Sequence, residues 1–264
     1  MSLISLHDKQ AIADFAAHNP FYHLYEIGDL DDFFWPHVIW YGWQEQDLLR
    51  QIALLYIAQP TLPTLLANPE PPLDTMRAML STLLPLLPRR LYAHLHPDMV
   101  DLFSAHYAIE PHGLHYKMGL TDMAKLSQHD GSEVVALTEA DLPAIDQLYK
   151  AAYPGNWFDA RNLQSNAYVG IRSGNALISI AGIHVYSPHY QVAALGNVTT
   201  LPSERGKGLA QRTCAKLCQT LLARGINKIG LNVKADNAAA LHSYAKLGFT
   251  KAAEYGEYLL DNPR

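Results

Sequence analysis

Long apolar runs are absent from this 264-residue sequence, and no stretch approaches the ~20 apolar residues that a membrane-spanning helix needs. The first twenty residues also lack a basic start followed by a continuous apolar block, which is the pattern of a secretory signal. We therefore expect a cytoplasmic protein that has no membrane partner.

Cysteine is scarce as well, because only Cys214 and Cys218 occur. Their spacing of four places both on one helix face, where the two Cα atoms are too far apart for easy bridging. They are either small buried residues or ligands of a metal, but a metal site would need further ligands nearby. The 13 histidines form no His-Glu-x-x-His or similar set. We expect no metal.

Basic residues are few in the first half of the chain. Residues 1–132 hold 7 Lys and Arg against 15 Asp and Glu, a net charge of −8, whereas residues 133–264 hold 13 against 10, a net charge of +3. An acidic half argues against a general nucleic-acid-binding protein, which would present a basic face. The mildly positive half suits an anionic small-molecule ligand.

The length suits two domains of about 130 residues each. Residues 128–132 are polar and contain Asp130-Gly131, a dipeptide typical of turns and linkers. We therefore predict one mixed α/β domain over residues 1–130 and a second over residues 131–264. A Pro-rich stretch over residues 60–72 interrupts the strands and helices of the first.

Apolar periodicity in the second half predicts the element order β-α-α-β-β-β-α-β-α-β, a mixed α/β domain. Thr138 is placed to cap its first helix, and Gly225 to end a long amphipathic one. The predicted segments are 134–137, 138–152, a short helix from 157, 168–171, 176–186, 190–201, 205–224, 228–233, 237–246, and one or two strands from 249 onward.

The most informative segment follows a predicted strand and opens the long helix; it reads Arg205-Gly206-Lys207-Gly208-Leu209-Ala210. Glycines at a helix start let the backbone pass close to a ligand and turn its free N–H groups toward it. With the positive end of the helix they form an anion site suited to a pyrophosphate. By itself the turn has two interpretations, phosphate binding and simple capping of a helix.

A second segment, about thirty residues later, follows the strand that ends near Asn232; it runs from Asn237 to Phe249 and contains the helix predicted over residues 237–246. The two segments together resemble the GNAT superfamily of acyl-CoA N-acyltransferases. The pattern Arg-x-x-Gly-x-Gly/Ala is met by Arg205, Gly208 and Ala210. The pattern Asn-x-x-Ala-x-x-x-Tyr-x-x-x-Gly-Phe is met by Asn237, Ala240, Tyr244, Gly248 and Phe249.

This resemblance covers roughly residues 133–264 and implies the acyl-CoA N-acyltransferase fold there. Residues 195–202, which read Leu-Gly-Asn-Val-Thr-Thr-Leu-Pro, look like a bacterial branch related to the glycine N-acyltransferase type. The first half has no matching Gly turn or Asn–Tyr pair. Its element order suggests a degenerate copy of the same fold, as in tandem members of the superfamily.

The resemblance implies acetyl-CoA, or another acyl-CoA, as cofactor. Val198, Thr199 and Thr200 would end a strand that splays from its neighbour, and their backbone groups would bind the pantetheine arm like an added strand. Asn237 would orient the cofactor from the far side of the splay, with Asn232 a further candidate nearby. The pyrophosphate would be held by Arg205, Gly206, Lys207, Gly208, Leu209 and Ala210.

Tyr244 has two interpretations from its residue pattern, a core aromatic beside Leu241 and Leu247 or a functional phenol. The resemblance implies that it is the general acid facing the thioester sulfur. A leaving thiol with a pKa near ~8.5 departs more easily when a phenol, with a pKa of about 10, protonates it.

A general base is harder to identify, since residues 191–203 contain no carboxylate. Asn197 and Thr199 could at most position a water. His184, on the preceding strand, is either the base or an ordinary surface or core histidine. An α-amine with a pKa near ~7.7–8.0 needs less help in losing its proton than a lysine amine near ~10.4. We therefore expect an acceptor with an α-amine or another amine of low pKa.

The acceptor pocket is expected at the aromatic, turn-rich loop over residues 153–158, where Trp157 and Phe158 would line it or plug the sheet. The acceptor would be a small molecule or a peptide. The sequence is also compatible with a homodimer. Two other classes of function stay open beside the enzyme. One is a sensor that binds acyl-CoA without turnover, and the other is a module in which the first half binds a protein.

Overall fold

The computed structural model describes residues 1–59 and 61–262, which form two compact units. Unit 1 joins residues 1–117 to residues 234–236 and to the chain from Ala253 onward, and unit 2 joins residues 118–233 to residues 237–252. The units thus divide earlier than the expected boundary between residues 130 and 131. The last strand, β12 (Phe249–Asp261), starts in unit 2 and ends in unit 1.

The strands of unit 1 lie in the order β1-β2-β3-β4-β5-β12-β6. Strands β1 to β4 pair antiparallel in sequence, β4 and β5 pair parallel, and β12 pairs antiparallel with β5. Their bounds are β1 Ser2–Leu6, β2 Val38–Glu45, β3 Leu48–Tyr56, β4 Thr64–Ala67, β5 Arg90–Leu95 and β6 Ala108–Leu120.

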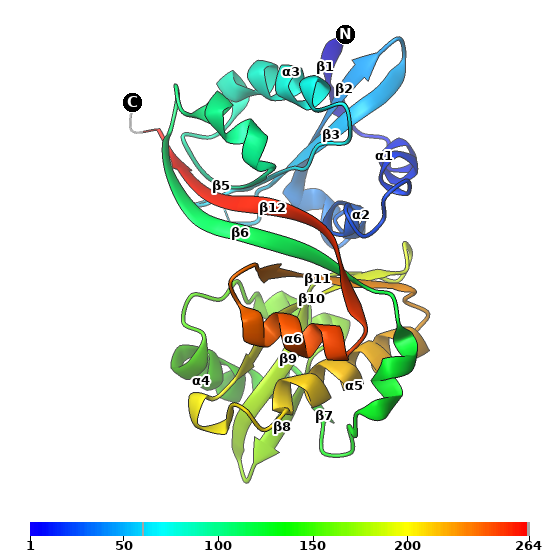
Figure 1. Cartoon of the computed structure of the whole chain (residues 1–264), viewed down its shortest axis with the longest axis vertical. Coiled ribbons are helices and arrows are strands. Elements are labelled where there is room, and N and C mark those ends of the chain that lie inside the picture. The colour runs from blue at the N-terminus through cyan, green and yellow to red at the C-terminus, as the bar shows by residue number, and fades with distance from the viewer. Residues whose placement is uncertain (60, 263–264) are drawn as a thin grey trace. The chain divides into compact units, whose positions relative to one another are not determined.

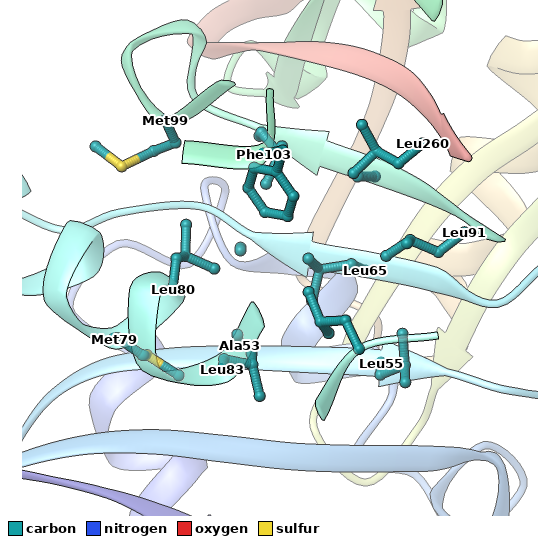
Figure 2. Close-up of a cluster of buried hydrophobic side chains, with 14 of the residues drawn as sticks. Ala53, Leu55, Leu65, Met79, Leu80, Leu83, Leu91, Met99, Phe103 and Leu260 are labelled. Atoms are coloured by element: carbon teal, nitrogen blue, oxygen red, sulfur yellow. The ribbon is translucent and has the colours of Figure 1, made fainter. Parts of the chain in front are cut away.

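The core of unit 1 forms between the sheet and α3 (Leu73–Leu83). Apolar residues at helical spacing place Met76, Met79, Leu80 and Leu83 on one buried face of α3. Figure 2 shows part of this face beside strand residues such as Leu55, together with Leu260 from β12. The other helical segments of the unit are α1 Lys9–Ala16, α2 Leu24–Gly28, and the 3-10 turns η1 Trp35–His37, η2 Leu84–Leu86 and η3 Pro97–Phe103.

Unit 2 contains the strand order β7-β8-β9-β10-β11. Pairing is antiparallel from β7 to β10 and parallel between β10 and β11. The bounds are β7 Val135–Ala136, β8 Val169–Ser173, β9 Ala176–Ser187, β10 Val192–Thr200 and β11 Lys228–Lys234. All five strands were predicted, with small differences at their ends.

Helix α4 (Leu142–Ala152) begins after a capping box in which the carboxylate of Asp141 accepts from the backbone N–H of Thr138 at 2.8 Å. Figure 1 shows α5 (Leu209–Ala223) and α6 (Ala238–Lys246) side by side. The cysteines Cys214 and Cys218 lie buried and free on α5, as small core residues. The short turns are η4 Met123–Gln128, η5 Glu139–Asp141, η6 Ala160–Ser165 and η7 Pro202–Glu204.

Three sequence-based expectations about the elements were wrong. Helix α5 starts at Leu209, because Gly206 and Gly208 have positive φ values of 80° and 74° that a helix cannot contain. The helix expected from Trp157 is only the turn η6. Strand β4 lies inside the Pro-rich stretch, where the prolines flank it and leave its four residues free to pair.

Each half of the chain passes through the same order of elements. Within the described residues, both begin with a strand followed by one or two α-helices and short 3-10 turns, and continue with three antiparallel strands, a helix and a strand parallel to the third. Each ends with a helix or 3-10 turn and a long strand, β6 or β12. Across the described residues, every helix is too short or too polar to cross a lipid bilayer.

Candidate active site

The parallel strands β10 and β11 separate at one end. They are paired from Val192–Lys228 to Leu195–Leu231, but β10 continues to Thr200 and β11 reaches Val233 within unit 2. Beyond Leu195 the edge of β10 that faces β11 is therefore available to another extended chain. Val198, Thr199 and Thr200, for which the resemblance implies a splayed strand, lie on this part of β10.

An irregularity in β10 sets the start of the splay. The register with β9 shifts between Gly196 and Thr199, and Asn197 adopts a positive φ of 54°. A β-bulge of this kind bends a strand and re-aims its backbone groups. The hydroxyl of Tyr149 on α4 donates to the carbonyl oxygen of Asn197 at 2.9 Å and so holds the bulge from the helix side. Burial raises the pKa of Tyr149, so this donor keeps its proton.

The Gly-rich turn leads directly into α5. Among the described residues, the backbone N–H groups of residues 206–210 donate no hydrogen bond to the protein. Gly206 has no atom within 4 Å of the place where a Cβ would lie. The turn thus presents free N–H donors and the positive end of a 15-residue helix to solvent, which fits a pyrophosphate.

The basic side chains at this turn have their own partners. The Arg205 guanidinium donates to the carbonyl oxygens of Thr200 at 3.2 Å and Ala152 at 3.5 Å, so it ties β10 to the end of α4. Lys207 Nζ donates to Glu204 at 2.8 Å. Leu209 is buried in α5, and Ala210 is half-buried in its first turn. The structure therefore assigns Arg205 an additional bracing role that its sequence position did not suggest.

The second motif forms the start and the end of α6. The side chain of Asn237 caps the helix by accepting from the Ala240 N–H at 3.1 Å. Tyr244 is half-buried, and its ring lies edge-on to Phe249 with centroids 5.8 Å apart. Gly248 ends the helix at a φ of 96°, and its carbonyl oxygen accepts from the N–H groups of Thr121 and Asp122. Asn232 lies half-buried on β11.

Two paired glycines shape one face of the sheet beside the bulge. Gly182 on β9 lies directly opposite Gly196 on β10. The ring of Tyr168 covers Gly182, 2.0 Å from where a Cβ would lie, and the ring of His184 covers Gly196, with the corresponding distance 2.1 Å. Each ring thus occupies space that any other residue at the glycine would fill.

The aromatic loop joins this face. The Phe158 ring contacts Tyr149 at 5.1 Å and Tyr168 at 5.7 Å between centroids. The Tyr168 hydroxyl donates to the Ile183 carbonyl oxygen at 2.9 Å and accepts from Asn197 Nδ2 at 3.3 Å. Phe158 and Asn197, two of the expected substrate residues, therefore meet through Tyr168. Trp157 is more exposed, with 37% of its surface accessible.

Sequence reasoning missed Tyr149, Tyr168 and the glycine pair. Each of the predicted strands 176–186 and 190–201 contains a glycine inside it, and such glycines indicate a bulge or a close approach of another group. Their pairing, however, depends on the register between β9 and β10.

The equivalent place in unit 1 is built differently. Strands β4 and β5 stay paired to their last residues, Ala67 and Leu95. The turn between β4 and α3 reads Asn68-Pro69-Glu70-Pro71-Pro72, with three residues that lack an N–H and one carboxylate. Asp74 adds a negative charge to the first turn of α3. This turn is unsuited to a pyrophosphate.

The family model described as "Acetyltransferase (GNAT) family" matches residues 133–249. The N-alpha-acetyltransferase RimI of Mycobacterium tuberculosis is 35% identical over 127 residues, which are 44% of this chain and 77% of that protein. A mycothiol acetyltransferase of Tsukamurella paurometabola is 31% identical over 106 residues. That match spans 39% of this chain and only 36% of that relative's length.

Solved structures extend the likeness to the whole fold. A Drosophila protein superposes with a TM-score of 0.70 at 11% identity and covers 99% of both chains. A tandem GNAT protein from the clavulanic acid biosynthesis pathway superposes with a TM-score of 0.56 at 13% identity, covering 100% of this chain and 99% of its own. These relatives leave the finer placement near the glycine N-acyltransferase type as a prediction. The motifs, the splayed strands and the relatives agree, and the chain belongs to the GNAT acetyltransferase family.

Proposed function

We propose that the protein transfers an acetyl group from acetyl-CoA to a primary amine by direct attack of the amine on the thioester. The observation that carries this proposal is the combination of the open edge of β10 beyond Leu195 with the free N–H groups of residues 206–210. The first would bind the pantetheine arm and the second the pyrophosphate. Lys207 would add positive charge at the turn, and Asn232 and Asn237 lie on the other side of the splay.

Tyr244 would serve as the general acid toward the sulfur. It lies on α6, the helix that follows β11, and its contact with Phe249 holds the ring in place. Protonation of the sulfur by a phenol would convert a thiolate leaving group to a thiol. The acetyl group would leave CoA as the amide of the acceptor.

The acceptor would carry an α-amine. A lysine amine at pH 7 is free in roughly one part in a few thousand, a deficit of about 4–5 kcal/mol, whereas about a tenth of an α-amine is already free. The absence of a carboxylate from residues 191–203 favours the acceptor that needs less help. The name of the Mycobacterium tuberculosis relative, an N-alpha-acetyltransferase, points to the same kind of amine.

Unit 1 would be a copy of the fold that does not bind acyl-CoA. Its β4–β5 pair has no splayed end, and its phosphate turn is replaced by a proline-rich, acidic one. One acyl-CoA site per chain follows from this proposal.

Thermal unfolding with and without acetyl-CoA tests the cofactor site. Acetyl-CoA at 100 times its dissociation constant should stabilise the wild type by about 2.7 kcal/mol. Gly208→Glu, which puts bulk and negative charge at the start of α5, should abolish the rise in unfolding temperature that acetyl-CoA causes in the wild type. Gly225→Glu is the matched control, since it introduces the same residue at a positive-φ glycine with open space at the other end of the same helix. Loss of the shift in both variants, or no shift in folded wild type, would contradict the proposal.

A pair of peptides tests the acceptor. One has a free N-terminal alanine and no lysine, and the other has an acetylated N-terminus and one lysine; release of CoA is followed for both. Faster release with the first peptide is expected. A clear preference for the lysine peptide would overturn the α-amine assignment, and binding of acetyl-CoA with no transfer to any amine would indicate a sensor.

A further inference from the structure

We propose that His184 is the group that takes the proton from the acceptor amine. This inference rests on the proposed function, because it assigns a residue to a step of that reaction. Residues 191–203, which include all of β10, contain no carboxylate that could take this proton.

The position of His184 follows from the glycine pair. Its ring lies against Gly196, where a Cβ would be 2.1 Å from Cδ2 and 2.4 Å from Nε2. Gly196 lies between the two register shifts of β10 with β9, at Ala194/Leu195 and at Gly196/Thr199, and it follows Leu195, the last residue paired with β11. The imidazole therefore sits at the point where the two strands separate. It is only partly buried, so protons can pass from it to solvent.

The same face of the sheet is the one that an acceptor would reach. Residues directly opposite in an antiparallel pair point to the same side, so the rings over Gly182 and Gly196 share one face. Tyr168, which covers Gly182, contacts Phe158, and Phe158 contacts Tyr149 on α4. The face of His184 is thus covered by α4 and the aromatic loop, where the acceptor pocket was expected.

An independent observation marks a ligand position on this face. Asn197 is 4% exposed, and its Oδ1 has no hydrogen-bond partner within the described residues. The orientation of this amide is set by Tyr168, whose hydroxyl donates to Ile183 and can only accept from Asn197 Nδ2. A buried acceptor without a donor calls for one from outside the chain, such as a water or the amine itself.

The step balances in its atoms and charges. The lone pair of the amine nitrogen forms a bond to the thioester carbon, and the carbon–sulfur bond breaks. The proton on the nitrogen moves to a ring nitrogen of His184, which becomes imidazolium, and the proton of the Tyr244 hydroxyl moves to the sulfur. Both groups return to their starting state by exchange with solvent.

Two tyrosines and one carboxylate also lie around this face of the sheet. Burial raises the pKa of Tyr168 to about 12 and also raises that of Tyr149, so both stay protonated. The carboxylate of Asp159 is held in an ion pair with Arg161 at 2.5 Å.

The test measures log(kcat/KM) against pH with acetyl-CoA and the alanine peptide, from pH 5.5 to 9. The α-amine, with a pKa near ~7.7–8.0, and His184 must each lose a proton before transfer, so the wild-type slope at the acidic end should exceed one. In His184→Gln the slope should stay at one, and kcat/KM should fall on the order of 100-fold with an unchanged acetyl-CoA thermal shift. Added imidazole should restore part of the activity of His184→Ala. His189→Gln, an exposed histidine in the same hairpin, is the control and should behave as wild type.

A wild-type slope of one throughout would overturn the inference without any variant, as would a His184→Gln enzyme within threefold of wild type. Should His184→Gln unfold, the wild-type slope and the imidazole response of His184→Ala decide. Absence of transfer by wild type would instead remove the proposed function itself.

Discussion

Gly248 shows how a single residue position can be dictated by the backbone around it. It has a φ of 96°, and a Cβ there would lie 2.0 Å from the carbonyl oxygen of Asp122. The same residue accepts hydrogen bonds from the N–H groups of Thr121 and Asp122. A side chain at this position would therefore meet backbone, which cannot move aside as a flexible side chain could.

Gly248→Ala should destabilise unit 2 by about 3 kcal/mol, through left-handed strain plus displacement of the Asp122 carbonyl. Gly174→Ala is the control, because Gly174 has a φ of 57° and no atom lies within 4 Å of the place where its Cβ would be, so only the strain remains. Urea denaturation midpoints of the two variants measure the difference. Equal losses would mean that the contact with Asp122 is not tight.

Tyr244→Phe separates catalysis from packing, since the ring that contacts Phe249 is kept and only the hydroxyl is removed. We expect kcat to fall roughly 100-fold or more while the thermal shift with acetyl-CoA is unchanged. Steady-state kinetics with the alanine peptide measures the first quantity. Unchanged kcat would assign the proton on the sulfur to another group.

At the scale of elements, the difference between the two parallel strand pairs decides which unit can bind a cofactor. In unit 2 the pair separates and a glycine turn with free N–H groups follows; in unit 1 the pair stays closed and a proline-rich turn follows. The first four N–H groups of a helix have no intrahelical acceptor, so the start of a helix can bind a ligand only where these N–H groups exist and face outward.

Three strands of unit 1 build a polar cluster instead. Glu257 on β12 accepts from the hydroxyls of Tyr92 at 2.5 Å and Tyr255 at 2.8 Å, and lies 3.5 Å from both His94 and His115. Burial would raise the pKa of Glu257, but the neighbouring His94 and His115 and the two hydroxyls outweigh it and lower the pKa. Burial lowers the pKa of His94 to about 4.

His94 should make the stability of unit 1 depend on pH. Its pKa is depressed on folding, so the folded state holds it neutral while the unfolded chain protonates it below about pH 6.5. Stability should therefore fall as the pH drops from about 6.5 to 4, by up to roughly 3 kcal/mol. Glu257, His115, Lys117 and Tyr255 also face this group, and a comparison of wild type with His94→Gln isolates its contribution. Parallel stability curves for the two proteins would contradict the prediction.

At the scale of the whole molecule, the chain crosses between its two units more than once. The second half of β12 pairs with β5, from Gly256–Leu95 to Asp261–Arg90, and brings Leu260 into the core of unit 1. Unit 1 therefore uses three features that the N-terminal half of the chain does not supply: the strand β12, the core residue Leu260 and the carboxylate of Glu257.

A chain that ends at residue 252 should lose protection from hydrogen exchange in β5 while β8 to β10 keep theirs. The reason is that β5 loses its antiparallel partner and Leu260, whereas the pairings of β8, β9 and β10 lie within unit 2. A chain that ends at residue 261 retains β12 and should resemble the full protein. Unchanged protection of β5 in the shorter chain would show that β12 is dispensable there.

Features that depend on neighbours in sequence could be predicted from the sequence itself. The glycine turn before α5, the cap at Thr138, the apolar face of α5 and the strands of unit 2 were all found this way, because turns, caps and periodicity are local properties. The motifs at Arg205–Ala210 and Asn237–Phe249 were enough to indicate the family. The prediction of a helix from Trp157 was wrong, and strand β4 among the prolines was not predicted. In both places tertiary contacts outweighed weak local preferences.

Only the tertiary structure decided which distant residues meet. The register of β9 with β10 places Gly182 opposite Gly196 and the rings of Tyr168 and His184 over these two glycines. The packing of α4 allows the Tyr149 hydroxyl to bond to the bulge. The return of β12 to unit 1 depends on its pairing with β5. Such pairings are chosen by the total burial and hydrogen bonding of the folded chain, which no single segment encodes.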